Sequence, residues 1–135
     1  MLTKYLLRLL IPLVIMVLGF ILRVKGLNRP LGDHDENHYI LYFGFLEFKE
    51  IITTYFSASN HIFHTLLMRI MMILFGENNS IAVRLPSFIS GMVSLWLIYL
   101  TAFKLFRSRL ISNISLLVAA IHPIHILYSQ TARGY

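Results

Sequence analysis

Three long apolar stretches constrain the fold of this chain more than any other feature. They cover residues 5–22, 85–103 and 110–128. The second and third are nineteen residues each and contain no Lys, Arg, Asp or Glu, while the first contains one charge, Arg8. A helix needs about 20 apolar residues to cross about 30 Å of hydrocarbon. We therefore expect three membrane-spanning helices, with Pro12 tolerated inside the first.

The composition is that of an integral membrane protein. Hydrophobic residues make up 57% of the chain and charged residues 13%, whereas a soluble domain has nearer 25% charged residues. The net charge is +6, but the 12 Lys and Arg stand singly. They form no basic patch of the kind that nucleic-acid binding requires, so no nucleic-acid partner is expected. The absence of cysteine excludes a disulfide framework, a Cys-based zinc site and a thiol nucleophile.

Residues 23–84, between the first and second spans, contain two shorter helical candidates. Residues 38–48 are rich in Tyr and Phe, which favour the headgroup level of a bilayer. Residues 62–75 are bounded by turn residues at 57–60 and 76–80. On a helical wheel one stripe of this segment collects His61, His64, Thr65, Met68, Arg69 and Met72, and aliphatic residues fill the remainder. We expect two amphipathic interfacial helices here, and an all-α membrane fold overall.

The distribution of basic residues predicts the orientation in the membrane. The short connection 104–109 contains three basic residues and no acid, which places it in the cytoplasm. Three spans then leave the N-terminus cytoplasmic and put the loop 23–84 and residues 129–135 on the outer face. The basic residues within 23–29 favour the opposite orientation. However, this loop also contains all six acids of the chain, and long loops follow the positive-inside rule weakly.

The acidic pair Asp35-Glu36 lies in a polar island, residues 28–38, directly after the first span. Carboxylates beside a membrane helix are costly to desolvate and mark places where a substrate or an ion is handled. Asp33 and Glu36 also have the spacing of a helix capping box, which would put Asp35 in the first turn of a helix. Both interpretations hold together, because Asp33 can cap the helix while Asp35 faces a site.

Four short motifs occur in a fixed order along the chain. They are Asp35-Glu36 after the first span, Asn60-His61 at the start of an amphipathic helix, Arg84-Leu85-Pro86-Ser87 at the entry to the second span, and Ala132-Arg133-Gly134-Tyr135 after the third. This order resembles the N-terminal third of the C-type membrane glycosyltransferases, in particular the bacterial lipid A aminoarabinose transferases and protein O-mannosyltransferases. Ile62 stands where members often have Pro. The resemblance implies that residues 1–135 form a single membrane domain, the N-terminal part of a larger transferase.

The resemblance implies transfer of a sugar from a polyprenyl-phosphate-linked donor to a hydroxyl of a lipid, glycan or protein acceptor. The reaction would take place at the outer face of a prokaryotic inner membrane. Asp35 is the candidate base for the acceptor hydroxyl, since partial desolvation raises the pKa of a carboxyl group. Glu36 would orient Asp35 or contact the acceptor.

The leaving group of such a reaction is a lipid phosphate, whose growing charge needs a fixed cation. A guanidinium offers two parallel N–H groups to phosphate oxygens, and Arg133 is the candidate. The alternative for Arg133 is an anchor that reaches to the membrane interface. His61 and Tyr135 are the further candidates for binding the donor.

A metal site is a second hypothesis. His34 and His38 stand at i and i+4, on one face of a helix, as zinc ligands require. Helical zinc motifs need Glu directly after the first His or directly before the second, but here these positions hold Asp35 and Asn37. His61 or His64 would have to complete the site. No metal ligand is assigned, and dependence on a divalent metal stays open.

A third hypothesis is a membrane module without catalysis. Three spans enclose a lipid-donor cavity poorly by themselves, so this chain alone would bind membrane lipids and a partner without turnover. It would then be a subunit, or a fragment that is inactive in isolation.

Overall fold

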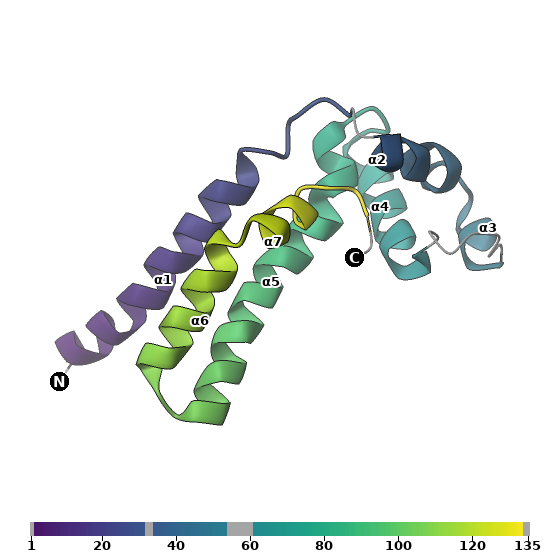
Figure 1. Cartoon of the computed structure of the whole chain (residues 1–135). Coiled ribbons are helices and arrows are strands. Elements are labelled where there is room, and N and C mark those ends of the chain that lie inside the picture. The colour runs from purple at the N-terminus through teal and green to yellow at the C-terminus, as the bar shows by residue number, and fades with distance from the viewer. Residues whose placement is uncertain (1, 32–33, 54–60, 134–135) are drawn as a thin grey trace.

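The computed structural model describes the backbone of residues 2–31, 34–53 and 61–133, and the side chains of these ranges from Leu9 onward except His34. Every regular element in this part of the chain is a helix (Figure 1). Three of them, α1 (Leu2–Val24), α5 (Ser80–Phe106) and α6 (Arg109–Ile121), lie side by side with α6 between the other two. The predicted all-α fold is confirmed.

Four further helices in the described part of the chain gather at the end of this bundle where α1 ends (Figure 1). They are α2 (His34–Tyr39), the π-helix η1 (Ile40–Gly44), α3 (Phe48–Thr53) and α4 (Ile62–Phe75). Helix α4 has the predicted bounds. The helix predicted over residues 38–48 is wrong in its extent, because α2 and η1 end at Gly44 and α3 begins at Phe48.

Helix α4 uses its predicted stripe to pack against the protein. Thr65, Met68 and Met72 are fully buried, and Met68 and Met72 join a core with Tyr39 and Phe43. On the other side of α4, Ile70, Ile73, Leu74 and Phe75 are exposed. The amphipathic pattern therefore orients α4, with the polar and Met-rich face inward.

Helix α5 has clear start and stop signals. The Asn79 Oδ1 accepts hydrogen bonds from the N–H groups of Ile81 at 3.0 Å and Ala82 at 3.4 Å, which satisfies N–H groups that lack a helical partner. At the other end Arg107 adopts a positive φ of 51°, and Ser108 caps α6 by accepting from the N–H of Ile111. This two-residue connection makes α5 and α6 an antiparallel helical hairpin.

Of the residues that the structure describes, only α5 forms a helix long and apolar enough to cross a membrane. The third predicted span, 110–128, is wrong as a single helix: α6 ends at Ile121 and α7 (Pro123–Tyr128) begins two residues later. Pro123 causes the break, because proline has no N–H and disfavours helical backbone in the preceding residue. His122 is accordingly extended, with ψ 120°.

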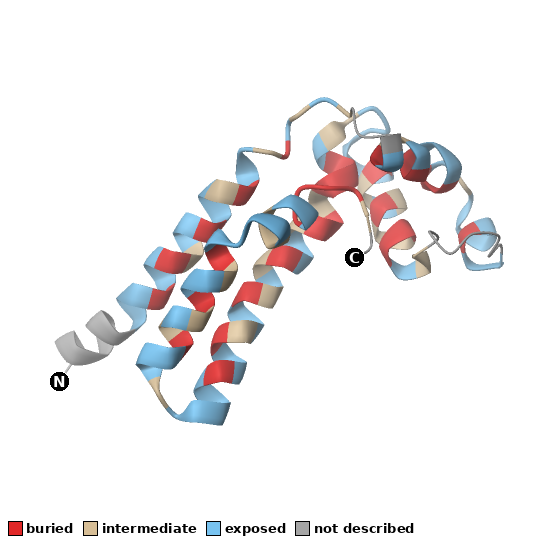
Figure 2. Cartoon of the chain, viewed as in Figure 1, coloured by how far each residue is buried: buried red, intermediate tan, exposed pale blue. Residues whose placement is uncertain are grey.

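The three long helices bury small inner faces and leave their outer faces apolar. Leu95, Leu116 and Ala120 are fully buried between them, while Leu13, Leu97 and Val118 are more than half exposed. Figure 2 shows buried residues along the sides of these helices that face one another and exposed residues along their outer sides. Apolar surface of this extent is rare on soluble monomers and suits contact with lipid.

Candidate functional site

Asp35 and Arg133 form an ion pair although 98 positions separate them. The Arg133 Nη1 donates to the Asp35 Oδ2 at 2.8 Å, and the Asp35 side chain is 62% exposed. Asp35 lies in the first turn of α2, and Arg133 lies just beyond α7. The sequence predicted both residues on one face, and the structure brings a carboxylate and a guanidinium together at an accessible position.

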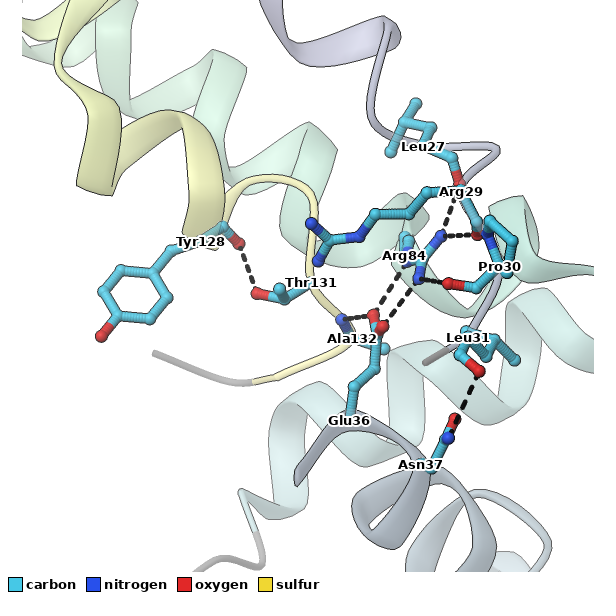
Figure 3. A network of polar contacts seen from close by, with 10 residues as sticks. All are labelled: Leu27, Arg29, Pro30, Leu31, Glu36, Asn37, Arg84, Tyr128, Thr131 and Ala132. Carbon is cyan, nitrogen blue, oxygen red and sulfur yellow. Dashed lines mark hydrogen bonds and ion pairs between the residues drawn. The ribbon is translucent and has the colours of Figure 1, made fainter. Parts of the chain in front are cut away.

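Glu36, the next residue, has the opposite environment. Its carboxylate is fully buried and forms a bidentate ion pair with the guanidinium of Arg84, at 2.6 Å from Nη2 and 2.8 Å from Nε (Figure 3). The backbone N–H of Ala132 donates to the same carboxylate at 2.8 Å. Glu36 therefore links α2 to the residue before Arg133, while Asp35 links α2 to Arg133 itself.

Arg84 also binds the segment that follows α1. Its Nη1 donates to the carbonyl oxygens of Leu27 at 2.8 Å and Arg29 at 2.6 Å, and its Nη2 lies 3.4 Å from the carbonyl of Pro30 (Figure 3). The guanidinium is fully buried. A buried ion pair is stable only when its remaining hydrogen-bonding groups are satisfied, and these contacts meet that condition. Sequence analysis gave Arg84 no such role.

The environment of Glu36 keeps it ionised. Burial opposes ionisation, but the hydrogen bonds from Arg84 and from the Ala132 N–H, with the positive charges of Arg84 and Arg29, outweigh it and lower the pKa of Glu36 below its usual value. A buried carboxylate with both oxygens bonded has no surface for an acceptor. The contacts of Glu36 are with Arg84 and Ala132.

A second network holds Arg133 from the side of α4 and α5. His64 Nε2 lies 2.9 Å from the hydroxyl of Ser87, and that hydroxyl donates to the carbonyl oxygen of Arg133 at 3.0 Å. Because the single Ser87 hydrogen is used on this carbonyl, the His64 Nε2 must be the donor. His64 Nδ1 lies 3.3 Å from the phenol oxygen of Tyr39, which also contacts Thr65 at 2.6 Å.

Burial shifts the ionisation of these side chains. It lowers the pKa of His64 to about 4, with a smaller contribution from repulsion by His61. Burial also raises the pKa of Tyr39, although the Thr65 hydrogen bond and the charge of Arg133 act in the opposite direction. His64 is therefore neutral at pH 7, and its single N–H, on Nε2, is used on the Ser87 hydroxyl.

A cavity of about 380 Å³ lies beside Arg133, between α4, α5 and α7. Phe63 and Leu67 contribute apolar walls, and the polar lining consists of His64, Ser87, Ser90, Ser94, His125, Tyr128, Ser129 and Arg133. This volume is within the range of sites for small molecules. The cavity thus offers neutral hydrogen-bonding groups and one guanidinium within an apolar bundle.

Of the other residues that the sequence singled out, His61 and His38 lie within the described part of the chain. His61 lies at the N-terminus of α4, with its ring centroid 6.4 Å from that of Tyr39. Tyr135 and the capping residue Asp33 fall outside the described residues. His38 stacks on Tyr42 at 4.2 Å, and in the part of the chain that the structure describes no group of three His, Cys, Asp or Glu could hold a metal. The side chain of His34 is outside that part.

The sequence did not predict the hydrogen-bonding roles of Tyr39 and His64 in the site, or the pairing of Arg84 with Glu36. Arg84 and Ser87 stand in one of the quoted motifs, and His64 lies on the predicted inner stripe of α4. The positions of Arg84, Ser87 and His64 in the sequence indicate that their side chains face the protein interior. Their partners are 23 to 48 residues away, so spacing along the chain could not reveal them.

The family of the chain follows from a comparison with protein families. The family model described as dolichyl-phosphate-mannose-protein mannosyltransferase matches residues 60–133, which is more than half of the chain. No curated protein and no solved structure matches it. The matched region contains Arg84, Ser87 and Arg133, and the acidic pair Asp35-Glu36 is joined to it by the contacts described above. The chain belongs to the dolichyl-phosphate-mannose-protein mannosyltransferase family, a family of membrane glycosyltransferases.

Proposed function

We propose that this chain carries the general base and the phosphate-binding cation of a glycosyltransferase. The reaction moves a sugar from a polyprenyl-phosphate-linked donor to an acceptor hydroxyl at the extracytoplasmic face of the membrane. The observation that carries the proposal is the ion pair of Asp35 and Arg133, a base and a phosphate-binding cation 2.8 Å apart at an accessible position. The family membership supports a lipid-linked sugar as the donor class.

Asp35 acts as the general base. The acceptor oxygen forms a bond to the anomeric carbon while its proton passes to the Asp35 carboxylate. The bond between the anomeric carbon and the phosphate oxygen breaks, and its electron pair stays on that oxygen. The phosphate then gains a negative charge, which Arg133 stabilises.

The donor must displace Asp35 from Arg133 for this reaction to begin. In the ion pair the Arg133 Nη1 is bonded to the Asp35 Oδ2, so neither group can serve a substrate fully. A donor phosphate that takes over the guanidinium frees the carboxylate for the acceptor proton. Since the Asp35 side chain is 62% exposed, the exchange costs little desolvation.

Glu36 positions both members of this pair and does not contact the acceptor. It is one residue from Asp35, and it bonds the N–H of Ala132, one residue from Arg133. Its buried ion pair with Arg84 fixes the carboxylate in one orientation. Positioned groups accelerate reactions because their orientation is set before the substrate binds. His61, at the start of α4, and Tyr135 remain candidates for donor contacts.

The test is sugar transfer by the protein reconstituted in vesicles with a polyprenyl-phosphate-linked sugar. Replacing Asp35 by Asn removes the base and should lower kcat by a factor on the order of 100 to 10,000. Glu47→Gln is the matched control, because it also neutralises one exposed acid of the same loop. Transfer by Asp35→Asn at the rate of the Glu47→Gln control, at equal expression, would exclude Asp35 as the base.

The predicted orientation has its own test. The chain has no cysteine, so a single cysteine introduced at Leu41, which is 68% exposed, reports the side of the membrane. We expect reaction with a membrane-impermeant thiol reagent from outside. If the cysteine reacts only after the membrane is permeabilised, Asp35 lies on the cytoplasmic side and the proposed function is refuted.

A further inference from the structure

Arg23 is a fully buried charge at the end of α1, and the proposed reaction does not use it. A buried guanidinium in an apolar bundle is costly unless its donors are bonded. Its Nη1 donates to the carbonyl oxygens of Gly19 at 2.9 Å and Ala120 at 3.0 Å. Its Nη2 donates to the Ala119 carbonyl at 3.3 Å.

The two remaining N–H groups bind α7 and the residue that follows it. Arg23 Nε donates to the Ser129 Oγ at 3.3 Å, and Nη2 donates to the Nδ1 of His125 at 2.8 Å. Since guanidinium nitrogens only donate, His125 accepts through Nδ1, is neutral, and uses its Nε2–H on the Ser94 hydroxyl at 2.9 Å. All five donors of Arg23 thus have partners on α1, α6 and α7.

Two of the three carbonyls that Arg23 binds, those of Ala119 and Ala120, are carbonyls that the helix break leaves open. A continuous helix would pair Ala119 and Ala120 with the N–H groups of residues 123 and 124. Pro123 has no N–H, and the extended His122 turns the chain out of the helix. No water is available in a lipid environment to satisfy such carbonyls. Arg23 therefore supplies the hydrogen bonds that the break removes.

The segment that follows α7 also donates hydrogen bonds to the end of α1. Gln130, two residues after α7, donates through Nε2 to the carbonyl oxygens of Leu22 and Arg23, each at 2.9 Å, and so caps α1. Gly26 leaves room for this amide, because a Cβ at position 26 would collide with it. Arg133 follows Gln130 by three residues. The contacts of Arg23 and Gln130 thus determine where the chain emerges toward Asp35.

We propose that Arg23 is a positioning residue for the transfer reaction: it stabilises the break between α6 and α7 that carries Arg133 to Asp35. The kinetic part of this inference rests on the proposed function, and the structural part does not. The break redirects the chain, since a helix continued through residue 123 would carry residues 129–133 along the axis of α6. Arg23 therefore acts on the Asp35–Arg133 pair through the backbone, without touching a substrate.

A double-mutant cycle tests the structural part. Arg23→Gln shortens the side chain and removes three of its five N–H groups, which breaks the set of bonds to α6 and α7 and should lower Tm in detergent. Pro123→Ala restores a backbone N–H. Arg23→Gln should therefore lower Tm less in the Pro123→Ala background than in the wild type. Arg107→Gln, the same change at an exposed arginine, is the control. Additive losses of Tm, or a loss no larger than that of the control, would refute the role of Arg23 at the break.

Distance measurements test the placement of α7 even if a variant is only partly stable. Spin labels on cysteines introduced at Leu41 and Ile124, which are 68% and 57% exposed, report the separation of η1 and α7. Arg23→Gln should shift or broaden this distance distribution, while Arg107→Gln should leave it unchanged. An unchanged distribution in folded Arg23→Gln protein would overturn the proposal.

Kinetics connect the placement to catalysis. Arg23→Lys keeps the charge but offers three N–H groups from one atom instead of a planar set of five. We expect kcat to fall on the order of 100-fold, the scale of a misplaced catalytic group, with KM for the donor changed less than threefold. An unchanged kcat would contradict the positioning role. Inactive wild-type protein would instead reject the proposed function, and the Tm cycle and distances would still decide the structural role of Arg23.

Discussion

Asp35 and Glu36 are neighbours in α2, yet one carboxylate is 62% exposed and the other is fully buried. Each binds an arginine, and each contacts the segment that follows α7. The exposed pair can exchange partners with a substrate, while the buried pair has no access to one. Under the proposed function these adjacent acids divide the tasks of reaction and positioning, and the difference in burial makes the division testable.

Breaking the buried pair should destabilise the protein much more than breaking the exposed one. Glu36→Gln leaves the buried Arg84 charge without a counter-ion, which costs about 3–5 kcal/mol. Asp35→Asn removes an exposed ion pair and should cost at most about 1 kcal/mol. Chemical unfolding in detergent, followed by circular dichroism, measures both. Equal losses of unfolding free energy in the two variants would contradict the described burial of Glu36.

Ser87 connects α4 to the backbone of Arg133. Ser87→Ala leaves the His64 Nε2–H and the Arg133 carbonyl without their shared partner, at a cost of about 1–3 kcal/mol. The matched control is Ser90→Ala, one turn further along α5 on the wall of the same cavity, which should change the unfolding free energy by less than half as much. A larger effect at Ser90 than at Ser87 would argue against this network.

His64 should make stability depend on pH. Its folded-state pKa is about 4 against an ordinary value of 6.5, so between these values the unfolded chain binds a proton that the folded chain does not. The free energy of unfolding therefore falls as the pH falls from about 6.5 to 4, by up to about 3 kcal/mol, and the contribution of His64 levels off below pH 4.

The control for the pH dependence is His64→Gln, in which the loss between pH 6.5 and 4.5 should largely disappear. Glu36 contributes in a lower window: its pKa is lowered in the folded state, so its stabilisation is present above pH 4.5 and is lost as the pH falls through the folded-state pKa. Thermal unfolding measured from pH 3.5 to 7.5 distinguishes the pH range in which His64 affects stability from the lower range in which Glu36 does. A pH profile identical in wild type and His64→Gln would contradict a buried, neutral His64.

Asn79 should contribute to the stability of α5 through its cap. Asn79→Ala removes the acceptor for the N–H groups of Ile81 and Ala82 and should cost about 1 kcal/mol. The exposed neighbour Asn78 is the control, because Asn78→Ala makes the same chemical change outside the cap. Equal Tm values for the two variants would show that the cap does not stabilise α5.

The sequence predicted the elements whose signals are local. The bounds of α4 follow from turn residues on both sides and from one amphipathic stripe, and α5 follows from an uncharged apolar stretch. The third span was wrong as one helix, because proline is tolerated in membrane helices and its presence alone does not fix the backbone of His122. Whether a proline breaks or only bends a helix depends on which group satisfies the freed carbonyls, here Arg23.

The candidate site was predictable in part. Charge and topology put Asp35 and Arg133 on one face, and the contact between them agrees with that expectation. The buried pair of Glu36 and Arg84 was not predictable, because 48 positions separate the two residues and an arginine entering a span ordinarily serves as an interfacial anchor. The structural role of Arg23 was hidden for the same reason, since all its partners outside α1 lie 96 or more positions away.

Arg84 has a consequence for the connection between the first helix and the acidic pair. Its guanidinium holds the carbonyls of Leu27, Arg29 and Pro30 in one register. Surface connections generally tolerate insertions and deletions, but residues 27–30 cannot slide or lengthen without releasing a buried cation. The number of residues from Leu27 to Pro30 is thus as restricted as the size of a core side chain, and natural length variation should be confined to positions outside this segment.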